Sequence, residues 1–199
     1  CDRRQRQLCI RDRTISIHRP KIVVIGSCNT DMVVKANRLP VPGETILGGT
    51  FYMNPGGKGA NQAIAAARLG AEVTFISKIG YDLFGLQALE IYRSEKINTE
   101  YIFTDQKSPS GVALISVDSF GENSIIVAPG ASRSLSIEDI NKAEEKIKEA
   151  DIILMQLEIP IDTVEYAATI ACKYGKKVIL NPAPASSLSN SFLKNVHTI

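Results

Sequence analysis

A glycine-rich stretch that runs into a helical pattern carries the most specific chemistry in this sequence. Residues 54–63 read NPGGKGANQA. Glycines permit close backbone approach and positive φ, and the unpaired amides at the start of a helix favour anions or hydroxyl oxygens. The residues that we expect to contact a ligand here are Gly56, Gly57, Lys58 and Asn61.

The spacing of these glycines excludes two common nucleotide-binding motifs. It is not G-x-G-x-x-G, the pattern of dinucleotide-binding turns. It is also not the GxxxxGK[ST] phosphate loop, because Gly59 follows Lys58 where that motif requires Ser or Thr. A glycine pair before a helix is by itself often only a turn, so the wider sequence has to identify the ligand.

Further polar residues follow buried strand patterns. Asn29 and Asp31 come after KIVVIG at 21–26, and Glu158 ends the run DIILMQLE at 151–158. Ligands of open parallel sheets bind outside the carboxyl ends of the strands. Asn and Asp also form turns for local backbone reasons, but positions i and i+2 of an extended segment face the same way. We therefore expect Asn29, Asp31 and Glu158 to meet at one ligand site.

The elements that position these residues alternate between strand and helix patterns. Strands are predicted at 21–26, 72–80, 151–158 and 176–184, and helices at 57–70, 83–96, 137–150 and 161–174. In the second helix, Leu83, Leu86, Leu89 and Tyr92 are expected to form one apolar stripe. Such alternation predicts an α/β fold with a doubly wound parallel sheet covered by helices on both faces.

Two regions depart from this alternation. Strand-like runs lie within about 32–53, and residues 111–128 have the pattern of a hairpin. We expect these four strands to form a small inserted β-sheet that acts as a lid over the crevice. The alternative is that they are edge strands of the main sheet.

Composition and charge narrow the class of protein. Residues 1–20 hold six arginines and two aspartates, whereas the remaining sequence holds 17 basic and 19 acidic residues. The body is therefore mildly acidic, which gives no support for nucleic-acid binding. No run reaches the length of a membrane span. Four scattered cysteines without a CxxC pair argue against a zinc site and favour a reducing, cytoplasmic location.

Both ends of the sequence look unlike the ends of a complete domain. The chain starts with Cys, and its first Met is Met32. We interpret residues 1–20 as a non-native or disordered leader rather than as a basic arm for nucleic acid. The last residues, NVHTI, have the pattern of a strand that would continue beyond them. We expect residues 21–199 to be an incomplete α/β domain that lacks the C-terminal part of its fold.

Five motifs in a fixed order carry a family resemblance. They are GSCNTD (26–31), PGET (42–45), GGKGANQA (56–63), MQLE (155–158) and NPAPA (181–185). With Gly70 and Gly80, they resemble the N-terminal signature of the ribokinase/PfkB family of carbohydrate kinases, from about Lys21 to the last residue.

The resemblance implies a function and a set of roles. It implies ATP-dependent phosphorylation of D-ribose to D-ribose 5-phosphate, with Mg²⁺ and a monovalent cation, K⁺, as cofactors. Asn29, Asp31, Gly56, Gly57, Lys58, Asn61 and Glu158 match sugar contacts of the family. The resemblance also implies a homodimer formed through the lid sheet, whereas the charge and the hydropathy described above indicate no nucleic-acid or membrane partner.

The sequence departs from the family where catalysis is expected. The family's base is an Asp in a later GAGD-type motif, which does not occur here. The resemblance places the NxxE magnesium motif in the same later segment. The chain thus has no catalytic or metal residue of its own and is expected to be inactive alone. The alternatives are a non-catalytic sugar-binding fragment and a deoxyribose or nucleoside kinase of the same family.

Overall fold

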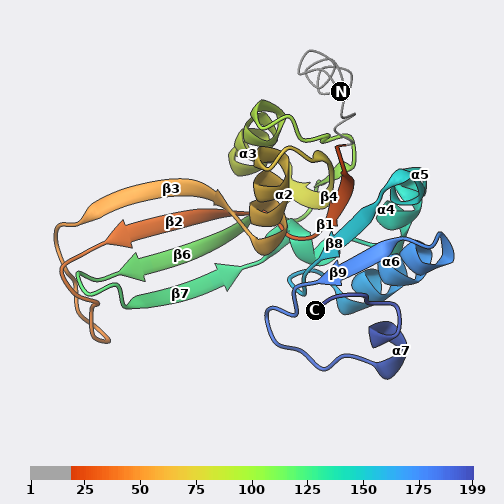
Figure 1. Ribbon diagram of the computed structural model, residues 1–199. Coiled ribbons are helices and arrows are strands. Elements are labelled where there is room, and N and C mark those ends of the chain that lie inside the picture. The colour runs from red at the N-terminus through yellow and green to blue at the C-terminus, as the bar shows by residue number, and fades with distance from the viewer. Residues whose placement is uncertain (1–18) are drawn as a thin grey trace, which may run out of the picture.

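The computed structural model describes residues 19–199, and the predicted leader at 1–20 lies outside the described residues except for its last two. A five-stranded sheet forms the body of the molecule (Figure 1). All its strand pairs are parallel, in the order β5-β4-β1-β8-β9. The strands are β1 (Lys21–Ile25), β4 (Glu72–Gly80), β5 (Ile102–Asp105), β8 (Ile152–Met155) and β9 (Lys177–Leu180).

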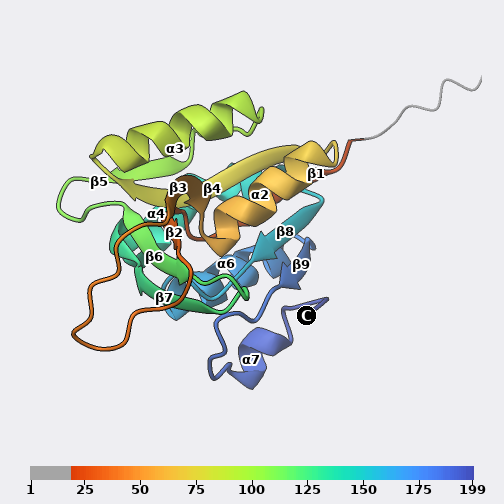
Figure 2. The ribbon, with the colours of Figure 1, turned by 90° about the vertical axis from the view of Figure 1, so that its left-hand side faces the viewer.

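Helices cover both faces of this sheet, as Figures 1 and 2 show. Alternate residues of a strand point to opposite faces, so in β1 Val24 packs into one core and Val23 and Ile25 into the other. The helices of the Val24 side are α2 (Lys58–Arg68) and α3 (Leu83–Ser94). Those of the other side are α4 (Ile137–Lys142), α5 (Glu144–Glu149), α6 (Ile161–Lys173) and α7 (Asn190–Leu193). The predicted doubly wound α/β fold is confirmed.

The two non-alternating regions form a separate four-stranded sheet, in the order β3-β2-β6-β7. Its strands are β2 (Asn29–Lys35), β3 (Thr50–Gly56), β6 (Gly111–Val117) and β7 (Asn123–Ala128). The β2–β6 pair is parallel and the other two pairs are antiparallel. Figure 1 shows this sheet reaching away from the body, so the alternative of four edge strands in the main sheet is excluded. We call it the lid sheet.

The lid strands begin and end closer to the body than the sequence patterns indicated. β2 starts at Asn29 because that residue already pairs with Gly56 of β3 and Gly111 of β6. β3 starts only at Thr50 and continues to Gly56. Asn29, Asp31 and Gly56 thus belong to the lid sheet itself and not to loops before it.

Four parts of the body differ from the predicted elements. The helix expected at 137–150 is divided at Ala143 into α4 and α5. The short strand β5, the 3-10 helix η1 (Gly130–Ser134) and the short helix α7 were not predicted. At the end of the chain, Thr198 bridges to Ile179 of β9, which agrees with the predicted start of a strand.

The predicted apolar stripe of α3 is wrong. Leu83 is 65% exposed and Leu86 55% exposed, whereas Tyr92 is fully buried. Each three-residue step falls about 60° short of a full helical turn, so Leu83 and Tyr92 lie on opposite sides of the helix. Gly85, Ala88 and Tyr92 make the buried face instead.

No helix among residues 19–199 combines the length and the apolar character that crossing a membrane requires.

Candidate functional site

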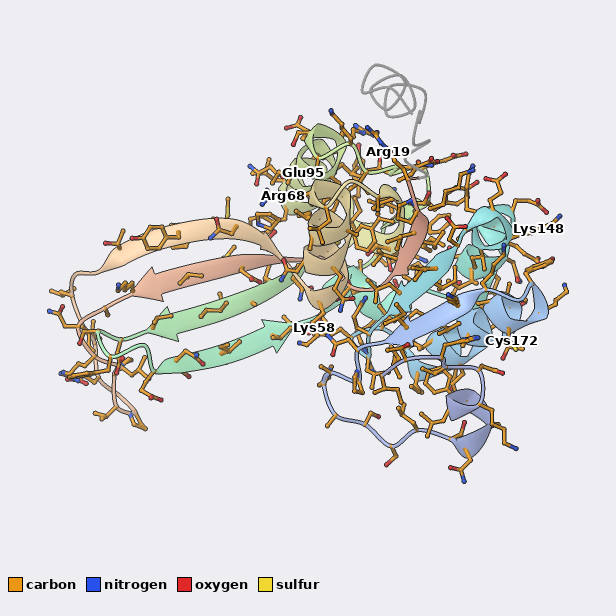
Figure 3. The ribbon with its side chains drawn as sticks, viewed as in Figure 1. Arg19, Lys58, Arg68, Glu95, Lys148 and Cys172 are labelled. Carbon is orange, nitrogen blue, oxygen red and sulfur yellow. The ribbon has the colours of Figure 1, made fainter. Side chains whose placement is uncertain are left out.

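A cavity of about 350 Å³ lies where the lid sheet meets the carboxyl ends of β1 and β8. Figure 3 labels Lys58 at this junction, between the lid sheet and the body. The residues that line the cavity are Ser27, Asn29, Lys58, Val127, Pro129, Arg133, Leu157, Glu158 and Pro184. Its position agrees with the rule that parallel sheets bind ligands beyond their carboxyl ends.

The Glu158 carboxylate organises one wall of this cavity. Its Oε2 accepts hydrogen bonds from Ser27 Oγ at 2.6 Å and from the Lys58 amide at 2.9 Å. Its Oε1 accepts from Lys58 Nζ at 2.5 Å. Burial alone would raise the pKa of Glu158, but the bonds from Lys58 and Ser27 outweigh it and hold this pKa below its ordinary value. Glu158 is therefore a carboxylate that fixes the start of α2 against the end of β1.

Glycines let the backbone of α2 approach β1 this closely. A Cβ on Gly59 would lie 2.6 Å from the Ser27 carbonyl oxygen, and the Ala60 amide donates to that same oxygen at 2.9 Å. Gly57, the residue before the helix, has φ 89°, a conformation that other residues rarely adopt. The GGKG pattern thus serves the packing of the helix start as well as the cavity.

Asn29 lines the cavity and carries an unsatisfied acceptor. Its side chain is 7% exposed, and its Oδ1 has no hydrogen-bond partner among the described residues. A buried polar atom without a partner costs about 1–3 kcal/mol. A ligand that brings a hydroxyl or N–H donor to Oδ1 would recover this free energy.

Asp31 lies two residues further along β2, on the same face of the lid sheet as Asn29. A Cβ on Gly56 would lie 2.0 Å from Asp31 Oδ1, so only glycine leaves room for the carboxylate. Burial raises the pKa of Asp31, and the charge of Glu158 adds to this shift while Lys58 opposes it. A ligand donor at Asp31 would favour the charged form of the group.

The structure brings most of the predicted site residues together. Asn29, Lys58 and Glu158 line the cavity. Asp31, Gly56 and Gly57 lie beside it through the close contacts described above. Asn61 is exposed on the first turn of α2 and is not among the lining residues, so its role stays a prediction.

Other lining residues were missed as site residues. Ser27 directly follows a buried strand, a signal that the sequence already contained. Pro184 belongs to the NPAPA motif and follows a cis peptide bond. Three more lining residues come from the end of β7 and from η1: Val127, Pro129 and Arg133. They reach the cavity only because the chain returns to the body after the β6–β7 hairpin, which no local sequence pattern indicates.

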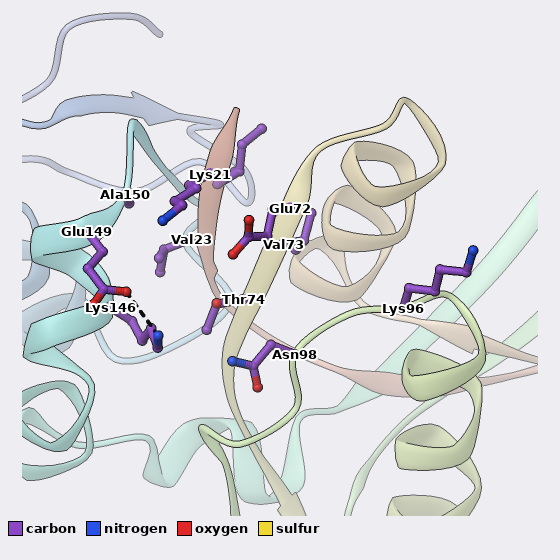
Figure 4. Close-up of a pocket in the computed structure, with 11 residues that line it drawn as sticks. Lys21, Val23, Glu72, Val73, Thr74, Lys96, Asn98, Lys146, Glu149 and Ala150 are labelled. Atoms are coloured by element: carbon purple, nitrogen blue, oxygen red, sulfur yellow. Dashed lines mark hydrogen bonds and ion pairs between the residues drawn. The ribbon is translucent and has the colours of Figure 1, made fainter. Parts of the chain in front are cut away.

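A second cavity, of about 100 Å³, lies at the amino ends of β1 and β4 (Figure 4). Lys21, Glu72 and Asn98 line it, and Lys146 pairs with Glu149 at 3.0 Å at its rim. This is the end of a parallel sheet opposite to the usual ligand site. Among residues 19–199, no group of three or more His, Cys, Asp or Glu side chains could hold a metal ion.

Comparisons with known proteins agree with this geometry. The family model described as pfkB family carbohydrate kinase matches residues 19–199. A ribokinase of Haemophilus influenzae is 45% identical over 181 residues, which are 91% of this chain and 59% of the relative. A deoxyribokinase of Salmonella typhi is 42% identical over 164 residues, which are 82% of this chain and 54% of the relative. The chain thus spans somewhat more than half the length of these relatives.

A solved structure of Arabidopsis thaliana ribokinase complexed with ribose and ATP has a similar fold. It superposes with a TM-score of 0.78 at 33% sequence identity, and the match covers 89% of this chain and 58% of that one.

The Glu158 network predicts a specific dependence of stability on pH. The folded-state pKa of Glu158 is lowered, so its contribution is present above the unfolded-state value and is lost as the pH falls through the folded-state value. Glu158→Gln should lower the free energy of unfolding by about 1–3 kcal/mol at pH 7. Urea unfolding should show this difference shrinking as the pH falls below 4.5, the ordinary value.

Glu90→Gln, on the exposed face of α3, is the matched control and should change little. A Glu158→Gln difference that is the same at all pH values would contradict the assigned role of the carboxylate.

Proposed function

This chain belongs to the pfkB family of carbohydrate kinases, and on that basis we propose that the whole protein phosphorylates D-ribose. In this reaction the 5-hydroxyl oxygen of ribose attacks the γ-phosphorus of ATP, and the products are D-ribose 5-phosphate and ADP. The observation that carries the proposal is the buried, unpaired Oδ1 of Asn29, a residue that lines the cavity with Lys58 and Glu158 and lies on the same lid-sheet face as Asp31.

The chemistry of the cavity suits a small polyhydroxylated ligand. Sugar hydroxyls both donate and accept hydrogen bonds, so a sugar site needs both kinds of partner. Asn29 Oδ1 and the Asp31 carboxylate accept, while Lys58 Nζ donates. We propose that Gly56, Gly57 and Asn61 add contacts from the start of α2, as in the sugar contacts of the family.

Apolar residues close the rest of the cavity. Val127, Pro129, Leu157 and Pro184 line it, and the first of these comes from the lid sheet. We propose that the lid sheet covers the bound sugar and keeps water away from the transferring phosphoryl group. Water would otherwise compete with the sugar hydroxyl as acceptor.

The phosphoryl-transfer machinery is proposed to lie outside this chain. ATP as donor is supported by the ribose and ATP complex of the Arabidopsis thaliana protein. The described residues offer no carboxylate cluster for Mg²⁺ or for a monovalent cation, so no step of the reaction is assigned to a metal here. The base is expected in the GAGD-type motif of the whole protein, and this chain alone should be inactive.

Deoxyribose is the second candidate substrate, because the Salmonella typhi relative is a deoxyribokinase with 42% identity. The two sugars differ by one hydroxyl group. The cellular location proposed for the protein is the cytoplasm, in keeping with free thiols at Cys28 and Cys172.

The direct test is to measure ADP formation from ATP and magnesium with D-ribose, with 2-deoxy-D-ribose and with D-fructose. We expect the whole protein to turn over ribose with the highest kcat/KM and this chain to show no turnover. Activity of this chain alone would place a catalytic base within it and would contradict the proposal that the base lies elsewhere in the whole protein.

A substitution at Asp31 tests the sugar site. Asp31→Ala in the whole protein should weaken ribose binding at least about tenfold, because loss of a charged acceptor costs about 1.5–3 kcal/mol. Titration calorimetry measures the affinity, and thermal unfolding shows whether the fold is kept. Asp162→Ala, exposed in the first turn of α6, is the control. Unchanged ribose affinity in a folded Asp31→Ala variant would remove Asp31 from the site.

We also propose a homodimer formed through the lid sheet. Its exposed apolar side chains include Phe51 (60%), Leu114 (51%), Ile125 (51%) and Ile126 (68%). Soluble monomers rarely expose large contiguous apolar patches, so a second lid sheet is a suitable cover.

Sedimentation velocity of the whole protein tests the dimer. Adjacent strand residues face opposite sides, so the double variant Ile125→Glu, Ile126→Glu places a charge on both faces and should yield a monomer. Leu69→Glu, at an exposed position outside the lid sheet, should remain dimeric. A monomeric wild-type protein would refute the proposal.

A further inference from the structure

Asp82 lies outside the cavity but accepts hydrogen bonds from Ser110, the residue directly before the lid strand β6. Its Oδ1 accepts from the Gly85 amide at 2.9 Å, as the N-cap of α3. The same carboxylate accepts from Ser110 twice, from Oγ and from the amide, both at 2.7 Å. Two of these three hydrogen bonds therefore come from outside α3, from Ser110, the residue that precedes β6.

Ser110 is itself held tightly against the body. It is 7% exposed, and its Oγ accepts from the Gly80 amide at 3.0 Å. A Cβ on Gly80 would lie 2.3 Å from the Ser110 amide nitrogen, so the two backbones approach as closely as glycine allows. Burial alone would raise the pKa of Asp82, but the bonds from Ser110 and Gly85 lower it and keep the acceptor charged.

The next residue, Gly111, touches the candidate sugar acceptor. Gly111 pairs with Asn29 in the parallel β2–β6 register. A Cβ on Gly111 would lie 2.2 Å from Asn29 Oδ1 and 2.8 Å from the Pro129 carbonyl oxygen. The Gly111 backbone therefore sets the limit on where the Asn29 side chain can lie.

The other linker of the lid hairpin is bonded to the same point. The Ala131 amide donates to the Pro109 carbonyl at 2.8 Å. One residue further, Ser132 Oγ accepts from the Cys28 amide at 3.3 Å and donates to the Cys28 carbonyl at 3.2 Å. The position of Asn29 is thus restrained on two sides, by Ser132 through the preceding residue Cys28 and by its strand neighbour Gly111. Asp82 restrains Gly111 through the bonds to Ser110.

From these contacts we infer that Asp82 is a positioning residue for the sugar site. Through Ser110 and Gly111, it sets the place of the Asn29 acceptor relative to the body of the protein. The inference rests on the proposed sugar-kinase function and deepens it. Asp82 is not among the residues that line the cavity, and the hydrogen bonds described above join it to Gly85 and Ser110, so its effect on sugar binding is indirect.

A serine at position 82 separates positioning from helix capping. Serine is a good N-cap and can keep the bond to Gly85, but its single hydroxyl cannot replace both bonds to Ser110. In the whole protein, Asp82→Ser should lower the melting temperature but remain folded, because a bond to the buried Ser110 is lost. It should raise the KM for ribose about 10- to 100-fold, as small displacements in a site do. The KM for ATP should stay within about twofold, since Asn29 is not expected to contact the nucleotide.

Two further variants make the test specific. Gly111→Ala should also raise the ribose KM, because the added methyl group would collide with Asn29 Oδ1 and displace the Asn29 side chain directly. Ser136→Ala removes the side-chain cap of α4, a hydrogen bond between Ser136 and Asp139 that does not involve Ser110 or Ser132. This variant should lower the stability without changing the ribose KM. A wild-type ribose KM in Asp82→Ser, or equal increases in the KM for ribose and ATP, would overturn the inference.

A crystal structure of Asp82→Ser provides a readout that does not depend on activity. The inference predicts that Asn29 shifts from its wild-type place relative to Glu158, and an unmoved Asn29 would overturn it. Absence of ribose phosphorylation by the wild-type protein would instead refute the proposed function, so the two failures are distinguishable.

Discussion

The Glu158 carboxylate is the interaction on which the site depends. It accepts from Ser27 at the end of β1 and from both the amide and the ammonium group of Lys58 at the start of α2. In the sequence, Glu158 is 131 residues away from Ser27 and 100 residues away from Lys58. Three donors to one carboxylate outweigh the cost of its partial burial, as its lowered pKa indicates. They fix the cationic wall of the cavity on the rigid body of the protein.

The opposite wall belongs to the lid sheet, which carries Asn29 and Asp31. The relation between the walls is set by very short linkers, Gly26–Cys28 before β2 and Gly57 after β3. At Gly56, Gly59 and Gly111 an added Cβ would meet Asp31, Ser27 or Asn29 at 2.6 Å or less. The site therefore depends on the close approach of neighbouring strands within the lid sheet and of α2 to the end of β1, and glycine permits both approaches.

The sequence was sufficient for the fold class and for the residues that strand ends and glycine motifs mark. The strand at 72–80 and the positions of Lys58 and Glu158 follow from local patterns alone. The prediction of the apolar stripe of α3 was wrong because residues three apart do not stay on one face of a helix. The buried face is instead the one on which Gly85 packs against Gly80 and Ser110. The contributions of Ser110, Ser132 and Arg133 arise from contacts between distant linkers, which no local pattern records.

The central claim is that the sugar binds between the two sheets, with acceptors from the lid sheet and the Lys58–Glu158 pair on the body. The most direct measurement is a crystal structure of the whole protein with D-ribose. The account predicts ribose hydroxyls within hydrogen-bond distance of Asn29 Oδ1 and of the Asp31 carboxylate, in the cavity beside Lys58. Ribose bound elsewhere, or bound there with Asn29 Oδ1 still unpaired, would contradict it.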